Sequence, residues 1–309
     1  MAAIITRLGL VLSLCVCAAS ASSVANAAAA PARTITTDFA VGPQYDSTHV
    51  YVDPTDLDAF VSSFVATLGG HASNPIVSTV TPTPSSTRFQ FVMSPAGPLS
   101  VFGYLTPIPY PFGLERTGYL VSDLNQAIAA ARSAGASVIV QPFKDPIGMD
   151  AVIEWPGGVK MQLYWHFVPP SNEPLASVPE NRIYVSPDRV DNFVNAFVHF
   201  SRGRVVEDLW HADASELGSL GGTYRRIRVE SKFGKLLVMA TDGHLPYPFG
   251  LEVSGYEVSD LSKTLSVAAA NGVKVLAAPR SAAGRTSAVV QFPGGFIAEI
   301  HSLQRGAAQ

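Results

Sequence analysis

Cysteine is almost absent from this sequence. The 309 residues contain only two, Cys15 and Cys17, and both lie close to the N-terminus. A mature chain that has lost this end contains no thiol, so it forms no disulfide and uses no cysteine as a nucleophile. The lack of cysteine also suits an oxidising compartment.

Long apolar runs are equally scarce, and the clearest one opens the chain. A single charged residue, Arg7, precedes an apolar run over residues 8–19, and Ala-Asn-Ala at 25–27 fits a signal-peptidase site. This order is typical of a secretory signal peptide, and the run is too short for a comfortable transmembrane helix. We therefore predict a signal peptide over residues 1–27 and a periplasmic or secreted product, with no membrane association beyond export.

Charge and several well-known motifs are missing as well. Only 15% of the residues are charged and the formal net charge is −3, so there is no basic field to hold nucleic acid or anionic lipid. The sequence has no glycine-rich phosphate loop, no Gly-x-Ser-x-Gly elbow and no His-Glu-x-x-His run. These absences exclude the commonest nucleotide-binding, serine-hydrolase and zinc-protease patterns.

What the chain does contain is an internal repeat. Residues 110–115 read Tyr-Pro-Phe-Gly-Leu-Glu, residues 247–252 read the same, and a Pro-Gly-Gly turn at 156–158 recurs at 293–295. Both matches have one offset of 137 residues (252 − 115 and 293 − 156). A constant register over some fifty residues indicates two copies of one unit. An aromatic residue before proline also favours a cis bond, so we examine Tyr110-Pro111 and Tyr247-Pro248 for one.

Each copy divides again into two modules. Four short runs rich in β-branched and aromatic residues predict strands, and each places a tyrosine at the same local position. A helical pattern follows each strand, with Ser122 and Ser259 placed as N-caps, and further strands follow each helix. The predicted module is β-α-β-β-β. The predicted domains cover residues 38–168 and 180–305, joined by a Pro- and Ser-rich linker at 169–179.

This arrangement resembles the vicinal oxygen chelate superfamily, which includes glyoxalase I, extradiol dioxygenases and bleomycin-resistance proteins. The last strands after the Pro-Gly-Gly turns, residues 158–163 and 295–300, are similar to the family signature Asp-Pro-x-Gly-x-x-x-Glu-Leu. The resemblance implies an α+β fold of four β-α-β-β-β modules paired into two glyoxalase-like half-open barrels. It also implies a small-molecule ligand and a divalent metal in the cavity, with Zn, Ni, Mn or Fe as candidates.

The resemblance assigns ligand positions to this chain, and neither half supplies the expected set. The first-half positions read His49, Thr117 (or Glu115, two residues earlier) and Gln162, and the second-half positions read Arg182, Ser254 (or Glu252) and Glu299. An arginine at a ligand position repels a cation. Because strand residues two apart share a face, His301 could join Glu299.

The candidate residues follow from these positions. We predict His49, Glu299 and His301 as metal ligands, and Glu299, Glu252 and Glu115 as catalytic carboxylates. A structural interpretation competes for the two repeated glutamates: proline and glycine shape a tight crossover, and the glutamate pairs with a neighbouring arginine such as Arg116.

Three functions remain open at this stage. The first is an exported glyoxalase-like protein that binds a small organic molecule and acts as a metal-dependent lyase or dioxygenase. The second is a metal-free protein that binds or sequesters such a molecule, and the third is a structural or interaction protein without catalysis. Residues 144–150 occupy the register of residues 281–287, which are small and nearly neutral. Such loop divergence on a common scaffold is expected if only one half binds a ligand.

Overall fold

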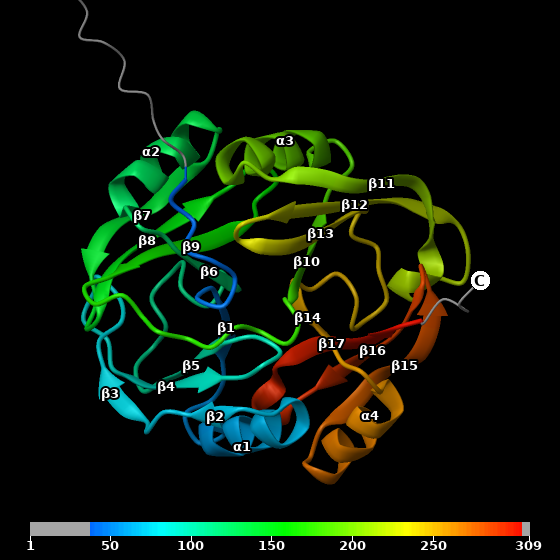
Figure 1. Cartoon of the computed structure of the whole chain (residues 1–309), viewed down its shortest axis with the longest axis horizontal. Helices are drawn as coiled ribbons and strands as arrows, with labels where there is room; N and C mark the ends of the chain where they lie inside the picture. Colours follow the sequence, from blue (N-terminus) through cyan, green and yellow to red (C-terminus); the bar gives the residue numbers. More distant parts are fainter. Residues whose placement is uncertain (1–37, 305–309) are drawn as a thin grey trace, which may run out of the picture. The chain divides into compact units, whose positions relative to one another are not determined.

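Each of the four predicted modules forms a strand, a helix and then a set of returning strands. The computed structural model describes residues 38–304 (Figure 1). The predicted signal peptide, residues 1–27, lies outside the described residues. The first module comprises β1 (Ser47–Tyr51), α1 (Leu57–Leu68), β2 (His71–Ala72), β3 (Ile76–Ser78), β4 (Thr87–Met93) and β5 (Leu99–Tyr104).

The second module has the same order with three returning strands. It comprises β6 (Thr117–Leu120), α2 (Leu124–Ser133), β7 (Ser137–Lys144), β8 (Gly148–Glu154) and β9 (Lys160–His166).

The third and fourth modules repeat this order. The third comprises β10 (Glu180–Val185), α3 (Val190–Ser201), β11 (Arg204–Asp213), the 3-10 turn η1 (Ala214–Leu217), β12 (Thr223–Ser231) and β13 (Gly234–Ala240). The fourth comprises β14 (Val253–Glu257), α4 (Leu261–Ala270), β15 (Lys274–Ala282), β16 (Arg285–Gln291), the 3-10 turn η2 (Pro293–Gly295) and β17 (Ile297–Leu303).

Modules pair two by two into mixed sheets. Over residues 38–304 the first sheet runs β2-β4-β5-β1-β6-β9-β8-β7, with β3 on β4, and the second runs β11-β12-β13-β10-β14-β17-β16-β15. In each module the first strand lies parallel to the last, and the two first strands meet antiparallel at the centre of each sheet. The predicted α+β fold of four paired modules is confirmed.

The helices form where apolar residues recur with helical spacing. In α1 the residues Leu57, Phe60, Val61 and Phe64 are all buried, as their 3.6-residue period requires. The predicted N-caps of α2 and α4 are wrong by one residue.

Asp123 and Asp260, rather than Ser122 and Ser259, cap α2 and α4. Each aspartate lies in extended backbone, and its carboxylate accepts a hydrogen bond from the third amide of the helix at 2.9 Å.

The two largest hydrophobic cores lie between the two halves. Helix α2 packs beside α3, and α1 packs beside α4 (Figure 1). Across the first contact the rings of Trp155 and Phe200 are 5.0 Å apart, and across the second those of Phe60 and Phe296 are 5.5 Å apart. Burying each such side chain contributes about 1.5–3 kcal/mol.

The two Pro-Gly-Gly turns take part in these contacts. Gly157 and Gly294 both have positive φ, and a Cβ on them would lie 2.9 Å from the Val185 Cγ1 and 2.8 Å from the Val52 Cγ1 respectively. Each turn thus abuts the first strand region of a module in the other half. Glycine is required there both for the turn and for the close approach.

Both examined proline bonds, Tyr110-Pro111 and Tyr247-Pro248, are cis. The domain boundaries at 38–168 and 180–305 stay predictions, because the halves share their cores. Among the helices of the described region, none is long and apolar enough to cross a membrane.

Candidate functional site

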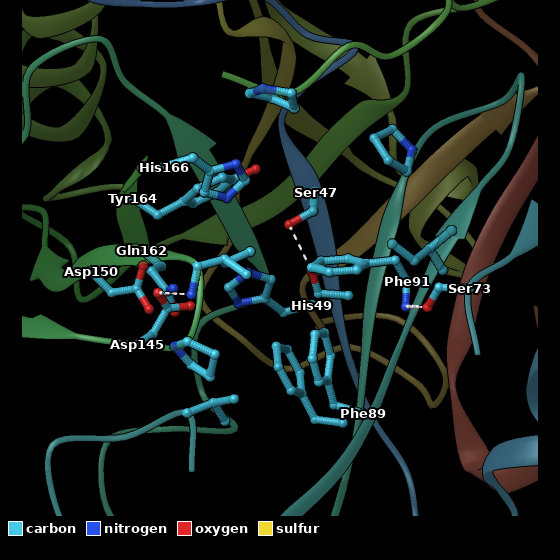
Figure 2. A pocket seen from close by; sticks show the side chains of 18 of the residues that line it. Ser47, His49, Ser73, Phe89, Phe91, Asp145, Asp150, Gln162, Tyr164 and His166 are labelled. Atoms are coloured by element: carbon cyan, nitrogen blue, oxygen red, sulfur yellow. Dashed lines mark hydrogen bonds between the residues drawn. The ribbon is translucent and has the colours of Figure 1, made fainter. Parts of the chain in front are cut away.

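One face of the first sheet holds a cavity of about 580 Å³. Its wall comes from β1, β4, β5, β8 and β9, and residues 167–172 beyond β9 add to it. Figure 2 shows the side chains that line it, among them His49, Phe89, Phe91, Tyr164 and His166. Nine of the lining residues are phenylalanine or tyrosine: Tyr45, Tyr51, Phe89, Phe91, Phe102, Tyr104, Phe112, Tyr164 and Phe167. The cavity is therefore apolar and aromatic over most of its surface.

Strand alternation decides which residues of β1 reach this cavity. Ser47, His49 and Tyr51 line it. Thr48 faces the other way, and its Oγ1 lies 2.8 Å from Ser254 Oγ of the second half. One face of β1 thus lines the cavity, and the other face contacts the second half.

His49 is the most buried polar residue of the cavity wall. It is 2% exposed, and its Nδ1 forms no hydrogen bond within residues 38–304. Glu115 Oε1 lies 3.6 Å from Nδ1 and accepts a hydrogen bond from the Tyr51 hydroxyl instead. Glu115 itself is fully buried behind these side chains and does not line the cavity.

Thr117, at the second ligand position implied by the resemblance, does not face the cavity. In the β1–β6 pairing Thr117 lies opposite Thr48, so it shares the face turned away from the cavity. The residue beside Ser47 is Gly118, which also pairs with Gln162. A Cβ at Gly118 would lie 2.5 Å from His49 Nε2, so the imidazole occupies the space that a ligand side chain would need.

Two carboxyl groups stand at the opposite wall, and the sequence reasoning did not single them out as site residues. Asp145 lies in the β7–β8 turn, where its Oδ1 accepts hydrogen bonds from the Ile147 and Gly148 amides. Asp150 is 5% exposed, and burial followed by the charge of Asp145 raises its pKa well above the ordinary value. Burial lowers the pKa of His166 despite the attraction of Asp145, which keeps this imidazole neutral near pH 7. The divergence of residues 144–150 between the halves was the sequence signal for this wall.

The matching face of the second sheet carries buried ion pairs. Arg182, at the position of His49, bonds Glu299 Oε1 at 2.9 Å, and His301 Nδ1 lies 2.8 Å from Glu299 Oε2. Glu180 is paired with Arg285 at 2.8 and 3.2 Å. Arg226, buried in the same sheet, bonds two further carboxylates, those of Glu207 and Glu216.

These pairs hold the carboxyl groups ionised. Burial alone would raise the pKa of Glu180, but Arg285, Arg182 and Arg228 together lower it to about 2. Burial opposes ionisation of Glu299 too, yet Arg182 and the His301 hydrogen bond keep its pKa below the ordinary value. Both oxygens of Glu299 are thus engaged by this chain's own side chains.

The donor sets do not fit a divalent metal in either half. Such an ion needs at least three anionic or imidazole donors that converge on one point. His49 lies in the first sheet and Glu299 and His301 lie in the second, and no group of three His, Cys, Asp or Glu residues that could hold a metal occurs in residues 38–304. The first half offers His49 and the neutral amide of Gln162, with glycine between them. In the second half an arginine already neutralises the carboxylate.

Glu252 lies at the contact between halves rather than in the cavity. Its Oε1 is 3.4 Å from Asn181 Nδ2. Burial raises the pKa of its carboxyl to about 8, opposed by the Asn181 amide and Arg116 and assisted by Glu115. The two repeated glutamates therefore influence each other electrostatically, and their catalytic role stays a prediction.

The raised pKa of Glu252 predicts that replacing it by glutamine stabilises the protein at high pH. A carboxyl group whose pKa is raised in the folded state makes the protein less stable as the pH rises. The loss occurs between about pH 4.3, the pKa in the unfolded chain, and about pH 8, the pKa in the folded protein. Near pH 4 the free energy of unfolding of Glu252→Gln should differ from that of wild type by only a constant offset. At pH 9 the difference should have shifted in favour of the variant by about 1–3 kcal/mol. Urea unfolding across this range measures the difference. Glu230→Gln, at a surface ion pair with Arg204, is the control and should run parallel to wild type.

Comparison of the sequence with protein-family models and with curated proteins finds no match. Solved structures do match. A mutant of 4-hydroxymandelate synthase from Streptomyces coelicolor has 14% identity and a TM-score of 0.57, over 84% of this chain and 93% of that one. The Mn(II)-bound glyoxalase from Novosphingobium aromaticivorans has 14% identity and a TM-score of 0.51, over 84% and 81%. A mutant of homoprotocatechuate 2,3-dioxygenase from Brevibacterium fuscum has 14% identity and a TM-score of 0.52, over 82% and 70%.

These likenesses span nearly all of the described region and agree with the strand order above. The chain has the fold of the vicinal oxygen chelate superfamily. At this identity the likeness concerns the fold, and the function has to be argued from the cavity.

Proposed function

We propose that the first half binds a small, largely apolar organic molecule in its cavity without the help of a divalent metal. The observation that carries this proposal is the cavity itself. Its volume of about 580 Å³ lies in the range of small-molecule sites, about 300–1,000 Å³, and its wall combines many aromatic surfaces with a few polar groups.

The polar groups of this wall support a ligand rather than a packed core. His49 and Gln162 stand side by side across Gly118 and can together orient a polar group of the ligand. The aromatic rings around them exclude water from that contact.

Metal-dependent lyase or dioxygenase chemistry is the less favoured function. The glyoxalase with a similar fold holds Mn(II), but the corresponding positions here offer His49, Gly118 and Gln162 in one half and Arg182, Gly255 and Glu299 in the other. We therefore propose binding or sequestration by the first half and a supporting role for the second. The N-terminal segment supports the further proposal that this happens outside the cytoplasm.

The test uses the mature protein and a neutral fluorescent probe, N-phenyl-1-naphthylamine. After exhaustive treatment with a chelator, we expect saturable binding of one probe per chain. Ser100→Trp replaces a buried serine of the cavity wall. Its indole should occupy the volume that the probe needs and weaken binding at least about tenfold.

The control is Ser133→Trp, at the exposed end of α2, which adds the same indole without touching the cavity and should bind like wild type. Binding that disappears on chelation and returns with Mn or Zn would contradict the metal-free site. Equal binding by wild type and Ser100→Trp would place the probe elsewhere and contradict the cavity as its site.

A further inference from the structure

The cavity wall has acidic side chains but no lysine or arginine to balance them. Asp145 and Asp150 are the only acidic residues among those that line it. Within residues 38–304 neither carboxyl group forms an ion pair, although arginines neutralise the buried carboxylates of the second half. Figure 2 shows both carboxyl groups beside Gln162, across from the Phe89 and Phe91 side.

Other titratable groups near this wall do not balance the two carboxyls. His166 and His49 line the cavity, and the pKa of His166 is lowered by burial, so it carries little charge near pH 7. Lys144 is exposed, and its Nζ lies over the Phe167 ring, 5.5 Å from the centroid. Tyr164 donates its hydroxyl to the Tyr45 carbonyl.

The opposite wall offers aromatic surface to the apolar body of a ligand. The rings of Tyr51 and Phe102 are stacked at 5.2 Å, and Phe89 stacks on Phe102 at 6.0 Å. The Arg116 guanidinium already lies over the Tyr51 ring, 5.8 Å from its centroid. Such a row of rings packs well against a flat, unsaturated ligand.

We propose that the ligand of this cavity is an organic cation, an amine joined to an aromatic or similarly apolar body, whose ammonium group lies between Asp145 and Asp150. This inference rests on the proposed binding function and adds the ligand class to it. The His49 side of the cavity accepts the apolar body, and Asp150, which is 5% exposed and lies beside Gln162, provides a buried carboxyl group that forms no ion pair within residues 38–304.

The electrostatics of the carboxyl pair agree with this assignment. Burial, and then repulsion from Asp145, raise the pKa of Asp150, and burial also raises the pKa of Asp145. Both effects oppose a second negative charge and favour any group that brings a positive one. An anionic ligand brings no positive charge to this pair and would oppose ionisation of the two carboxyl groups further.

Three probes of matched shape and different charge test the inference: 2-phenylethylamine, 2-phenylethanol and 3-phenylpropionate. Each is titrated at pH 7 in competition with N-phenyl-1-naphthylamine. We expect the amine to bind at least about tenfold more tightly than the alcohol and the propionate to bind weakest, because close charge pairs in desolvated sites contribute more than about 1.4 kcal/mol.

Asp150→Asn should weaken amine binding about tenfold more than alcohol binding. Asp145→Asn serves as the second variant if that protein does not fold. Glu154→Gln, also on β8 but paired with Lys160 outside the cavity, is the matched control and should keep the preference of wild type.

The outcomes separate the two proposals. If N-phenyl-1-naphthylamine itself does not bind, the proposed function fails. If it binds but the alcohol or the propionate competes as well as the amine, or the amine does not compete, the charge preference is wrong and the binding function stands.

Discussion

Replacement of Arg182 by leucine should lower the free energy of unfolding by about 3–5 kcal/mol, because it leaves the buried Glu299 carboxylate without its arginine partner. The Arg182 guanidinium lies 2.9 Å from Glu299 and 3.6 Å from Glu180, and all three side chains are at most 8% exposed. The loss is not the value of a salt bridge in general. It is the cost of the charge that stays behind in a site from which water is excluded.

Urea unfolding at pH 7 measures this effect. Two further variants show whether it comes from the buried charge that is left without a partner. Arg204→Leu breaks a surface pair, Arg204–Glu230, whose side chains are 77% and 46% exposed, and should cost less than about 1 kcal/mol. The double variant Arg182→Leu/Glu299→Leu should recover part of the loss, since an apolar pair can replace a buried ionic one. A single variant Arg182→Leu as stable as wild type would show that this face of the second half is hydrated rather than closed.

Replacement of Phe60 by alanine should cost about 3–5 kcal/mol, the range for deleting a buried aromatic ring. Phe60 belongs to α1 of the first half, is fully buried, and packs edge-on against Phe296 at 5.5 Å and Phe292 at 5.9 Å in the second half. The cavity left behind therefore opens on both halves at once. We expect both to lose stability together, in one unfolding transition.

Far-UV circular dichroism and tryptophan fluorescence report this transition. The fluorescence includes Trp155, in the first half at the other contact between halves, and Trp210 in the second half. Phe91→Ala is the control, because Phe91 also lies in the first half but lines the cavity and is only partly buried. It should cost less than about 2 kcal/mol, since much of its surface faces open space. Two separate transitions in Phe60→Ala, with the second half unaffected, would contradict the shared core.

The architecture could be read from the sequence because the repeat carries it. The offset of 137 residues aligns both Pro-Gly-Gly turns and both cis prolines, and repeated strand and helix patterns divide each half. Repetition is a property of the chain alone, so no knowledge of contacts was needed. The N-caps failed by one residue because Ser122 and Asp123 are both good caps, and only the backbone geometry selects between them.

The site was harder to predict because it depends on pairing between strands. Glu115 precedes β6, so alternation counted back from Thr117 does not describe it. Only the pairing of β1 with β6 places Gly118 beside Ser47, with the His49 imidazole in the space next to it. The repeat carries one signal for this position, because Gly118 recurs as Gly255. The pairing of Arg182 with Glu299 spans 117 residues and leaves no local pattern.

One measurement tests the central claim that a single cavity, in the first half and without metal, takes the ligand. It is a crystal structure of the mature protein soaked with bromobenzene, with the bromine located by its anomalous scattering. Apolar cavities bind such small apolar molecules readily. The account predicts one bromine site between His49 and Phe89 in the first half, with the Arg182–Glu299 pair intact. Bromine bound at the Arg182–Glu299 face of the second half, with the first cavity filled by its own side chains, would contradict it.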